Sequence, residues 1–155
     1  MFISVVYYNF RYVYPKQIRE TETLNQLYFD NFNYSFSGIV TDYYENREGR
    51  GNHFGVVTLN LKQSDTDFYD PSDTTNIYFC VIKNEVAKVL IPVQYDLERI
   101  RGTKKYKSIV SGDSLVFNGQ KDNFTLYFDN DSVLWTPLWI STDSENRDGI
   151  VKYIH

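Results

Sequence analysis

Residues 36–62, FSGIVTDYYENREGRGNHFGVVTLNLK, decide the class of the fold. Two runs rich in β-branched and alternating apolar residues flank a polar loop that contains Gly49 and Gly51. Such a pattern predicts a β-hairpin, because β-branched residues fit a pleated sheet and glycines permit the reversal between strands. The stretch therefore indicates an all-β protein.

The rest of the chain repeats this pattern of short strands and turns. Further strands are predicted at about 76–83, 86–94, 114–118, 123–129 and 132–140, with tight turns at Lys83-Asn84-Glu85 and Asn118-Gly119. Aromatic residues make up 17% of the chain, which also favours strands. We expect an all-β, mainly antiparallel fold, a small barrel or sandwich with one or two short helices, one of them near residues 95–102.

The chain is divided into two parts by its composition. Residues 31–155 form a single predicted β-domain, and residues 1–30 an N-terminal strand or the remnant of a membrane anchor, followed by a connector. The apolar run at residues 1–10 is too short to span a bilayer and lacks a signal-peptide cleavage site. If the true start lies upstream of Met1, an anchor in the bacterial envelope is expected; otherwise the protein is expected in the cytoplasm.

Polar and aromatic residues suggest two binding surfaces. In the loop of the first hairpin, arginine offers bidentate hydrogen bonds to an anion, and glycine lets a ligand approach the backbone. Two tryptophans four residues apart would share one face of a strand, either in the core or stacked on a ligand. The candidate binding residues are Arg47, Arg50, Asn52, His53, Trp135 and Trp139.

A basic segment gives the main alternative, an OB-like barrel that binds nucleic acid. Its candidate residues are Arg99, Arg101, Lys104, Lys105 and Tyr106. The net charge of −4 gives no general attraction to phosphate, so a nucleic-acid partner is not favoured. The expected partner is instead an unknown protein or small-molecule ligand, with a membrane contact only through the N-terminal anchor.

Catalysis, metals and cofactors find little support. We expect His155, the last residue, to be mobile, which leaves His53 as the one imidazole for a second alternative, a hydrolase. Cys80 lies in an apolar run and is expected in the core. The aspartates of residues 65–73 lack the spacing of an EF-hand. No catalytic residue, metal ligand or cofactor is predicted, and a non-catalytic interaction domain is the leading hypothesis.

Three short motifs follow one another along the chain: FSGIV at residues 36–40, NH at 52–53 and GDSL at 112–115. In this order they resemble a group of small uncharacterised bacterial β-rich proteins, over about residues 34–128. The group has no assigned activity, and its members often begin with a membrane anchor. The resemblance thus implies an envelope location, with residues 1–14 ending an anchor, and no enzyme. The loop 45–52 and the insertion around 64–75 depart from the group.

Overall fold

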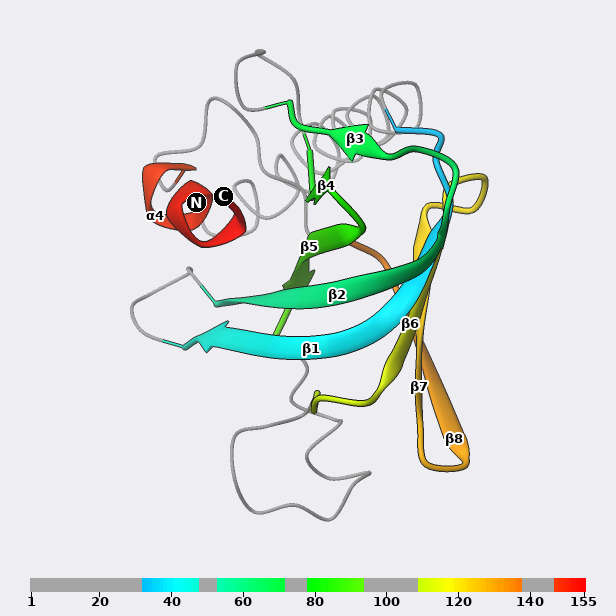
Figure 1. The fold of residues 1–155 in the computed structure, drawn as a ribbon. Coiled ribbons are helices and arrows are strands. Elements are labelled where there is room, and N and C mark those ends of the chain that lie inside the picture. Colours follow the sequence, from blue (N-terminus) through cyan, green and yellow to red (C-terminus); the bar gives the residue numbers. More distant parts are fainter. Residues whose placement is uncertain (1–31, 48–52, 72–77, 94–108, 138–146) are drawn as a thin grey trace, which may run out of the picture.

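The computed structural model describes residues 32–47, 53–71, 78–93, 109–137 and 147–155 (Figure 1). These residues form eight strands and one short helix. The elements are β1 (Phe36–Asn46), β2 (Phe54–Ser64), β3 (Phe68–Tyr69), β4 (Cys80–Lys83), β5 (Val86–Pro92), β6 (Ser114–Asn118), β7 (Asn123–Phe128), β8 (Asp131–Trp135) and α4 (Arg147–Ile154). The expected helix near 95–102 and the connector of the first 30 residues lie outside the described residues.

All eight strands belong to one antiparallel sheet in the order β3-β4-β5-β2-β1-β6-β7-β8. The prediction of an all-β, mainly antiparallel fold is therefore confirmed. The predicted barrel is wrong, since the sheet is not closed. In the described part of the chain, the outermost strands are β3, which pairs with β4, and β8, which pairs with β7; β3 and β8 do not pair with each other. The described strands belong to a single sheet and not to two.

The sheet bends strongly along β1 and β2 (Figure 1). This central pair joins two arms of the sheet, one made of β3, β4 and β5 and the other of β6, β7 and β8. The register between β1 and β2 shifts twice, after Ser37 and after Val40. Register shifts of this kind bend a strand and increase its twist. At the first shift, a Cβ added to Gly38 would lie 2.6 Å from the carbonyl oxygen of Asn60, so only glycine fits between the two backbones.

The motifs FSGIV and GDSL lie side by side. β1 pairs with β6 from Phe36, opposite Phe117, to Ile39, opposite Ser114. Gly112 has a φ of 100°, and its amide donates to the carbonyl of Val40 at 2.9 Å. Glycine thus permits the predicted reversal here. The two motifs form the junction from which the β6–β7–β8 arm departs.

Asp113 completes this junction. Oδ2 of Asp113 accepts from the amide of Val110, three residues earlier, at 3.0 Å. The Asp113 carbonyl also accepts from the amide of Val40 at 2.8 Å. The carboxylate is therefore used to close the turn that precedes β6.

The tight turn at Lys83-Asn84-Glu85 is confirmed. Lys83 pairs with Val86, and the two residues between them both have positive φ, 50° at Asn84 and 66° at Glu85. These angles define a type I′ turn, whose handedness matches the twist of the strands. The Asn118-Gly119 turn is also found, as a four-residue connection in which Asn118 pairs with Asn123.

The main core lies between the two arms of the sheet. Phe32, just before β1, is 2% exposed, and its ring lies 4.8 Å from that of Tyr69, 4.9 Å from Phe79 and 5.6 Å from Phe117. Tyr69 and Phe79, which directly precedes β4, belong to the arm of β3, β4 and β5, whereas Phe117 belongs to the arm of β6, β7 and β8. Packing of side chains therefore joins the two arms, whose outermost strands are not hydrogen-bonded to each other. The predicted core position of Cys80 is confirmed, because its side chain is fully buried.

A second, smaller core lies on the other face of β2, β5 and β4. Its buried members are Phe54, Val56, Tyr78, Val81, Leu90 and Ile154. Ile154 belongs to α4, which lies against this face (Figure 1). The sequence analysis did not predict α4. Its eight residues, RDGIVKYI, include a glycine and give too short a periodic pattern to identify a helix.

Candidate functional site

The predicted binding loop of the first hairpin is described only at its two ends. Arg47 forms an ion pair with Glu45, whose other oxygen accepts from the Tyr43 hydroxyl at 2.6 Å. These three residues alternate along β1, so they share one face of the strand. His53 is exposed at the start of β2. The guanidinium of Arg47 is thus engaged within the sheet, whereas Arg50 and Asn52 lie outside the described residues.

Of the two candidate tryptophans, the structure describes Trp135. The Trp135 ring is half-buried on β8, packs against the main core and lies 5.4 Å from the Phe124 ring in an edge-to-face arrangement. The core alternative is therefore the better description of Trp135. Trp139 and the basic residues Arg99, Arg101, Lys104, Lys105 and Tyr106 lie outside the described residues.

The structure places His155, the last residue, against the sheet. Its Nε2 lies 3.2 Å from the hydroxyl of the fully buried Tyr78, and its Nδ1 lies 3.7 Å from a carboxylate oxygen of Asp70. Asp70 also forms an ion pair with Lys83 of β4. This cluster was not predicted, because Asp70, Lys83 and His155 are far apart in the sequence and meet only when α4 lies on the sheet.

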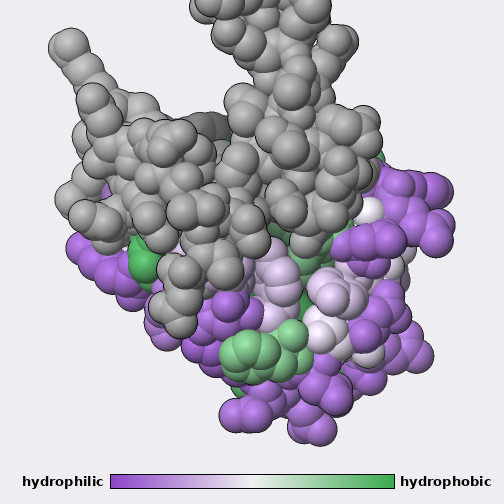
Figure 2. Space-filling view, turned by 90° about the horizontal axis from the view of Figure 1, so that it is seen from above, coloured by the Kyte–Doolittle hydropathy of each residue, from purple (hydrophilic) through white to green (hydrophobic). Residues whose placement is uncertain are grey.

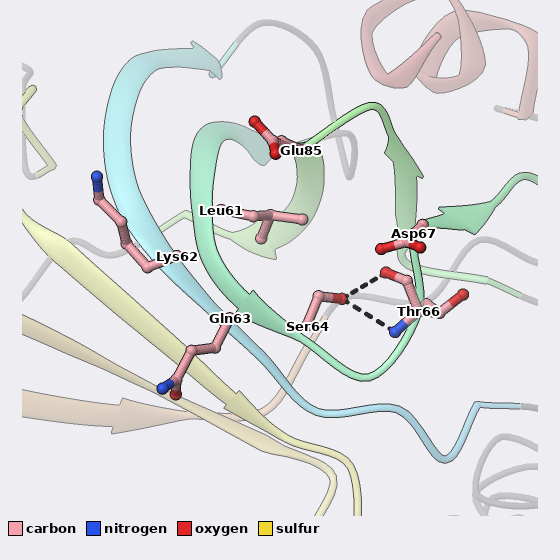
Figure 3. Close-up of a pocket in the computed structure, with 7 residues that line it drawn as sticks. All are labelled: Leu61, Lys62, Gln63, Ser64, Thr66, Asp67 and Glu85. Atoms are coloured by element: carbon pink, nitrogen blue, oxygen red, sulfur yellow. Dashed lines mark hydrogen bonds between the residues drawn. The ribbon is translucent and has the colours of Figure 1, made fainter.

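A polar hollow of about 160 Å³ lies where the end of β2 meets the tip of the β4–β5 hairpin (Figure 3). It is lined by Leu61, Lys62, Gln63, Ser64, Thr66, Asp67 and Glu85. The backbone fixes its walls: the amide of Leu61 donates to the carbonyl of Glu85 at 2.7 Å, and Ser64 Oγ donates to the carbonyl of Thr66 at 2.7 Å.

Figure 3 shows how the charged side chains surround this hollow. The carboxylates of Glu85 and Asp67 lie on two sides of it, with the aliphatic side chain of Leu61 between them. Lys62 extends away from Asp67. The site thus combines an apolar floor with two exposed carboxylates from different parts of the chain. Such a lining suits a group that carries positive charge at the end of an apolar stem.

A second hollow of about 140 Å³ adjoins the first and shares Gln63 and Ser64 with it. Its wall is held by Asp65, whose Oδ2 accepts from the amide of Ser35 at 2.8 Å. Ser35 Oγ in turn accepts from the amide of Gly119 at 3.2 Å. These bonds tie the loop after β2 to the turn after β6, so hydrogen bonds hold the wall of the second hollow.

On the face seen from above in Figure 2, the described residues in view are mostly hydrophilic, with small hydrophobic areas. Within the described ranges, no group of three or more His, Cys, Asp or Glu side chains could hold a metal ion. None of the helical residues that the structure describes forms a segment long and apolar enough to cross a membrane, and residues 1–14 are not among them.

The sequence analysis did not single out the residues of the two hollows. It described residues 64–75 as an insertion and placed Glu85 in a hairpin turn, and both descriptions are compatible with an ordinary surface. Only the pairing of β2 with β5 and the turn of the β4–β5 hairpin bring Glu85 beside Leu61. Comparison with protein-family models, with curated proteins and with solved structures found no match to this chain.

Proposed function

We propose that this protein is a non-catalytic interaction domain that accepts a basic side chain of a peptide or protein partner in the hollow beside Glu85. The observation that carries the proposal is the backbone conformation of Glu85. This residue has a φ of 66°, in the second central position of a type I′ turn. Glycine is strongly preferred there, because a Cβ in the left-handed region costs about 1 kcal/mol.

A residue that adopts a costly conformation is a candidate for a functional role. Glu85 carries an exposed carboxylate at the edge of a hollow, and Asp67 carries another across it. Glycine at position 85 would relieve the strain but remove one of the two charges. A glutamate at this position is understandable if its carboxylate binds a partner.

The chemistry of the hollow favours a lysine or arginine side chain as the bound group. The aliphatic stem would lie on Leu61, and the cationic head would reach the carboxylates of Asp67 and Glu85. Hydrogen bonds between a cation and a carboxylate are the stronger kind, although exposure to solvent limits their contribution. The interaction is therefore expected to be weak for an isolated side chain and to weaken further with salt.

An NMR titration with the peptide acetyl-Gly-Arg-Gly-amide tests the proposal. We expect saturable shifts confined to the amides of residues 61–67 and 85, with a Kd in the millimolar range. Glu85→Gln, which keeps the side-chain size and the turn, should weaken binding by about 3- to 10-fold, as expected for the loss of a partly exposed charge pair.

The matched control is Asp131→Asn, which removes an exposed acid at the start of β8, the opposite end of the sheet. This variant should bind the peptide like the parent protein. Shifts spread over unrelated acidic residues, or equal affinity in Glu85→Gln and the parent, would overturn the proposed site.

A further inference from the structure

We infer that α4 is a latch that opens and closes over the second core while the sheet remains folded. Three consecutive residues at its end, Tyr153, Ile154 and His155, make its described contacts with the sheet. Each of them meets a different part of the sheet, so the latch has an apolar, an aromatic and a polar fastening.

The apolar and aromatic fastenings are small. Ile154 is fully buried among the six residues of the second core. The Tyr153 ring stacks on that of Tyr44 with 4.3 Å between centroids and 15° between planes. The carbonyl of Tyr153 accepts from Lys88 Nζ of β5 at 3.4 Å, a long hydrogen bond. The contacts lie near the loop end of the β1–β2 hairpin and on β5.

The polar fastening joins three segments. The His155 ring lies between the Tyr78 hydroxyl, at 3.2 Å, and the Asp70 carboxylate, at 3.7 Å. Asp70 is also paired with Lys83, so the anion keeps a partner on the sheet when His155 leaves. The Asp70 side chain is 12% exposed and that of His155 is 22% exposed, so water can replace the contacts of the histidine. The release of His155 from the sheet is therefore expected to cost little free energy.

The sheet has its own source of stability. Its main core of seventeen described buried residues contains no residue of α4. An isolated helix of eight residues is not stable in water, so α4 forms only while its end is fastened. Opening therefore removes the helix as a unit and uncovers the outer face of β2, β5 and β4, including Phe54, Val56 and Leu90. Proteins commonly open in such local units.

Native-state hydrogen exchange of the full chain tests this inference. We expect the hydrogen-bonded amides at the end of α4, such as that of His155, which donates to the carbonyl of Val151 at 3.1 Å, to exchange at least about 100-fold faster than the amides of Val57 and Leu59 in β2. Their exchange should also be insensitive to low denaturant. Equal protection in α4 and β2 would show that the helix opens only when the protein unfolds, and would overturn the latch.

Two tyrosine variants test the polar fastening. Tyr78→Phe keeps the ring and removes the hydroxyl, so α4 should exchange about 3- to 10-fold faster, as expected for one net hydrogen bond, and should still exchange much faster than the amides of Val57 and Leu59. Tyr127→Phe removes an exposed hydroxyl on β7 and should leave the exchange of α4 unchanged. The inference fails if Tyr78→Phe leaves α4 unchanged, or if Tyr127→Phe accelerates α4 as much as Tyr78→Phe does.

Discussion

Replacing Phe32 by alanine tests how the two arms of the sheet are held together. The Phe32 ring is 2% exposed and makes edge-to-face contacts with five other rings, at centroid distances from 4.8 to 6.3 Å. A buried phenylalanine contributes about 1.5–3 kcal/mol through the area removed from water, and truncation to alanine in cores, which also leaves a cavity, costs about 3–5 kcal/mol. We therefore expect a loss of about 4 kcal/mol in the free energy of unfolding, roughly a quarter to four-fifths of that of an ordinary domain.

Urea unfolding followed by tryptophan fluorescence and thermal unfolding followed by circular dichroism would measure this loss. A change of 4 kcal/mol corresponds to a fall of about 8–16 °C in Tm for a chain of this length. Phe68→Ala is the matched control, because Phe68 lies on edge strand β3 and is 64% exposed. It should change stability by less than about 0.5 kcal/mol. A loss below 1.5 kcal/mol for Phe32→Ala, or equal losses for both variants, would refute the role of Phe32 in joining the arms.

Three further predictions concern the backbone and two buried groups. Gly38→Ala should destabilise the protein by about 2–3 kcal/mol in urea unfolding, because the new Cβ meets the carbonyl of Asn60; an unchanged midpoint would contradict the close approach. Glu85→Gly should raise the unfolding free energy by about 1 kcal/mol in the same assay, since glycine relieves the positive φ; a loss would show that Glu85 is not strained. Burial raises the pKa of the Cys80 thiol well above its ordinary value, and desolvation, followed by the charges of Cys80, Tyr34 and Tyr78, raises the pKa of Tyr69. The unfolded chain therefore loses these protons first, so stability is intact below the ordinary thiol pKa and should fall as pH rises through about 9 to 11. Urea midpoints at several pH values would check this, and Cys80→Ala should remove the earlier part of the fall.

Much of the sheet could be predicted from the sequence because its signals are local. The alternating residues on each side of the first hairpin predict β1 and β2, which the structure places at 36–46 and 54–64. The Lys83-Asn84-Glu85 turn predicts a tight hairpin, and the two positive φ values confirm it. Turn chemistry and strand periodicity act over a few residues, so a single sequence contains them.

Closure of the sheet could not be predicted, because it depends on distant strands. A barrel and an open, bent sheet share the same strands and turns. The difference lies in whether the outermost strands meet, and here Phe32 and its aromatic neighbours occupy the space between the arms. The motifs FSGIV and GDSL are far apart in the sequence and pair with each other in the sheet. Their pairing, and the junction that they form, could be identified only from the structure.

The candidate site was missed for the same reason. Sequence analysis turned to histidine, arginine and tryptophan, which are the usual carriers of chemistry, and two of the described members of that set, Arg47 and Trp135, are engaged within the fold. Glu85 looked like an ordinary turn residue. A glutamate in the second position of a predicted type I′ turn, where glycine is preferred, was the one signal present in the sequence.

The measurement that tests the central claim most directly is the NMR titration of Glu85→Gly with acetyl-Gly-Arg-Gly-amide. If Glu85 keeps its strained conformation in order to bind a basic group, the variant should be more stable than the parent and its shifts at residues 61–67 should no longer saturate. A variant that is more stable and binds the peptide as well as the parent would contradict the claim, and the hollow would then be a surface feature without a role in binding.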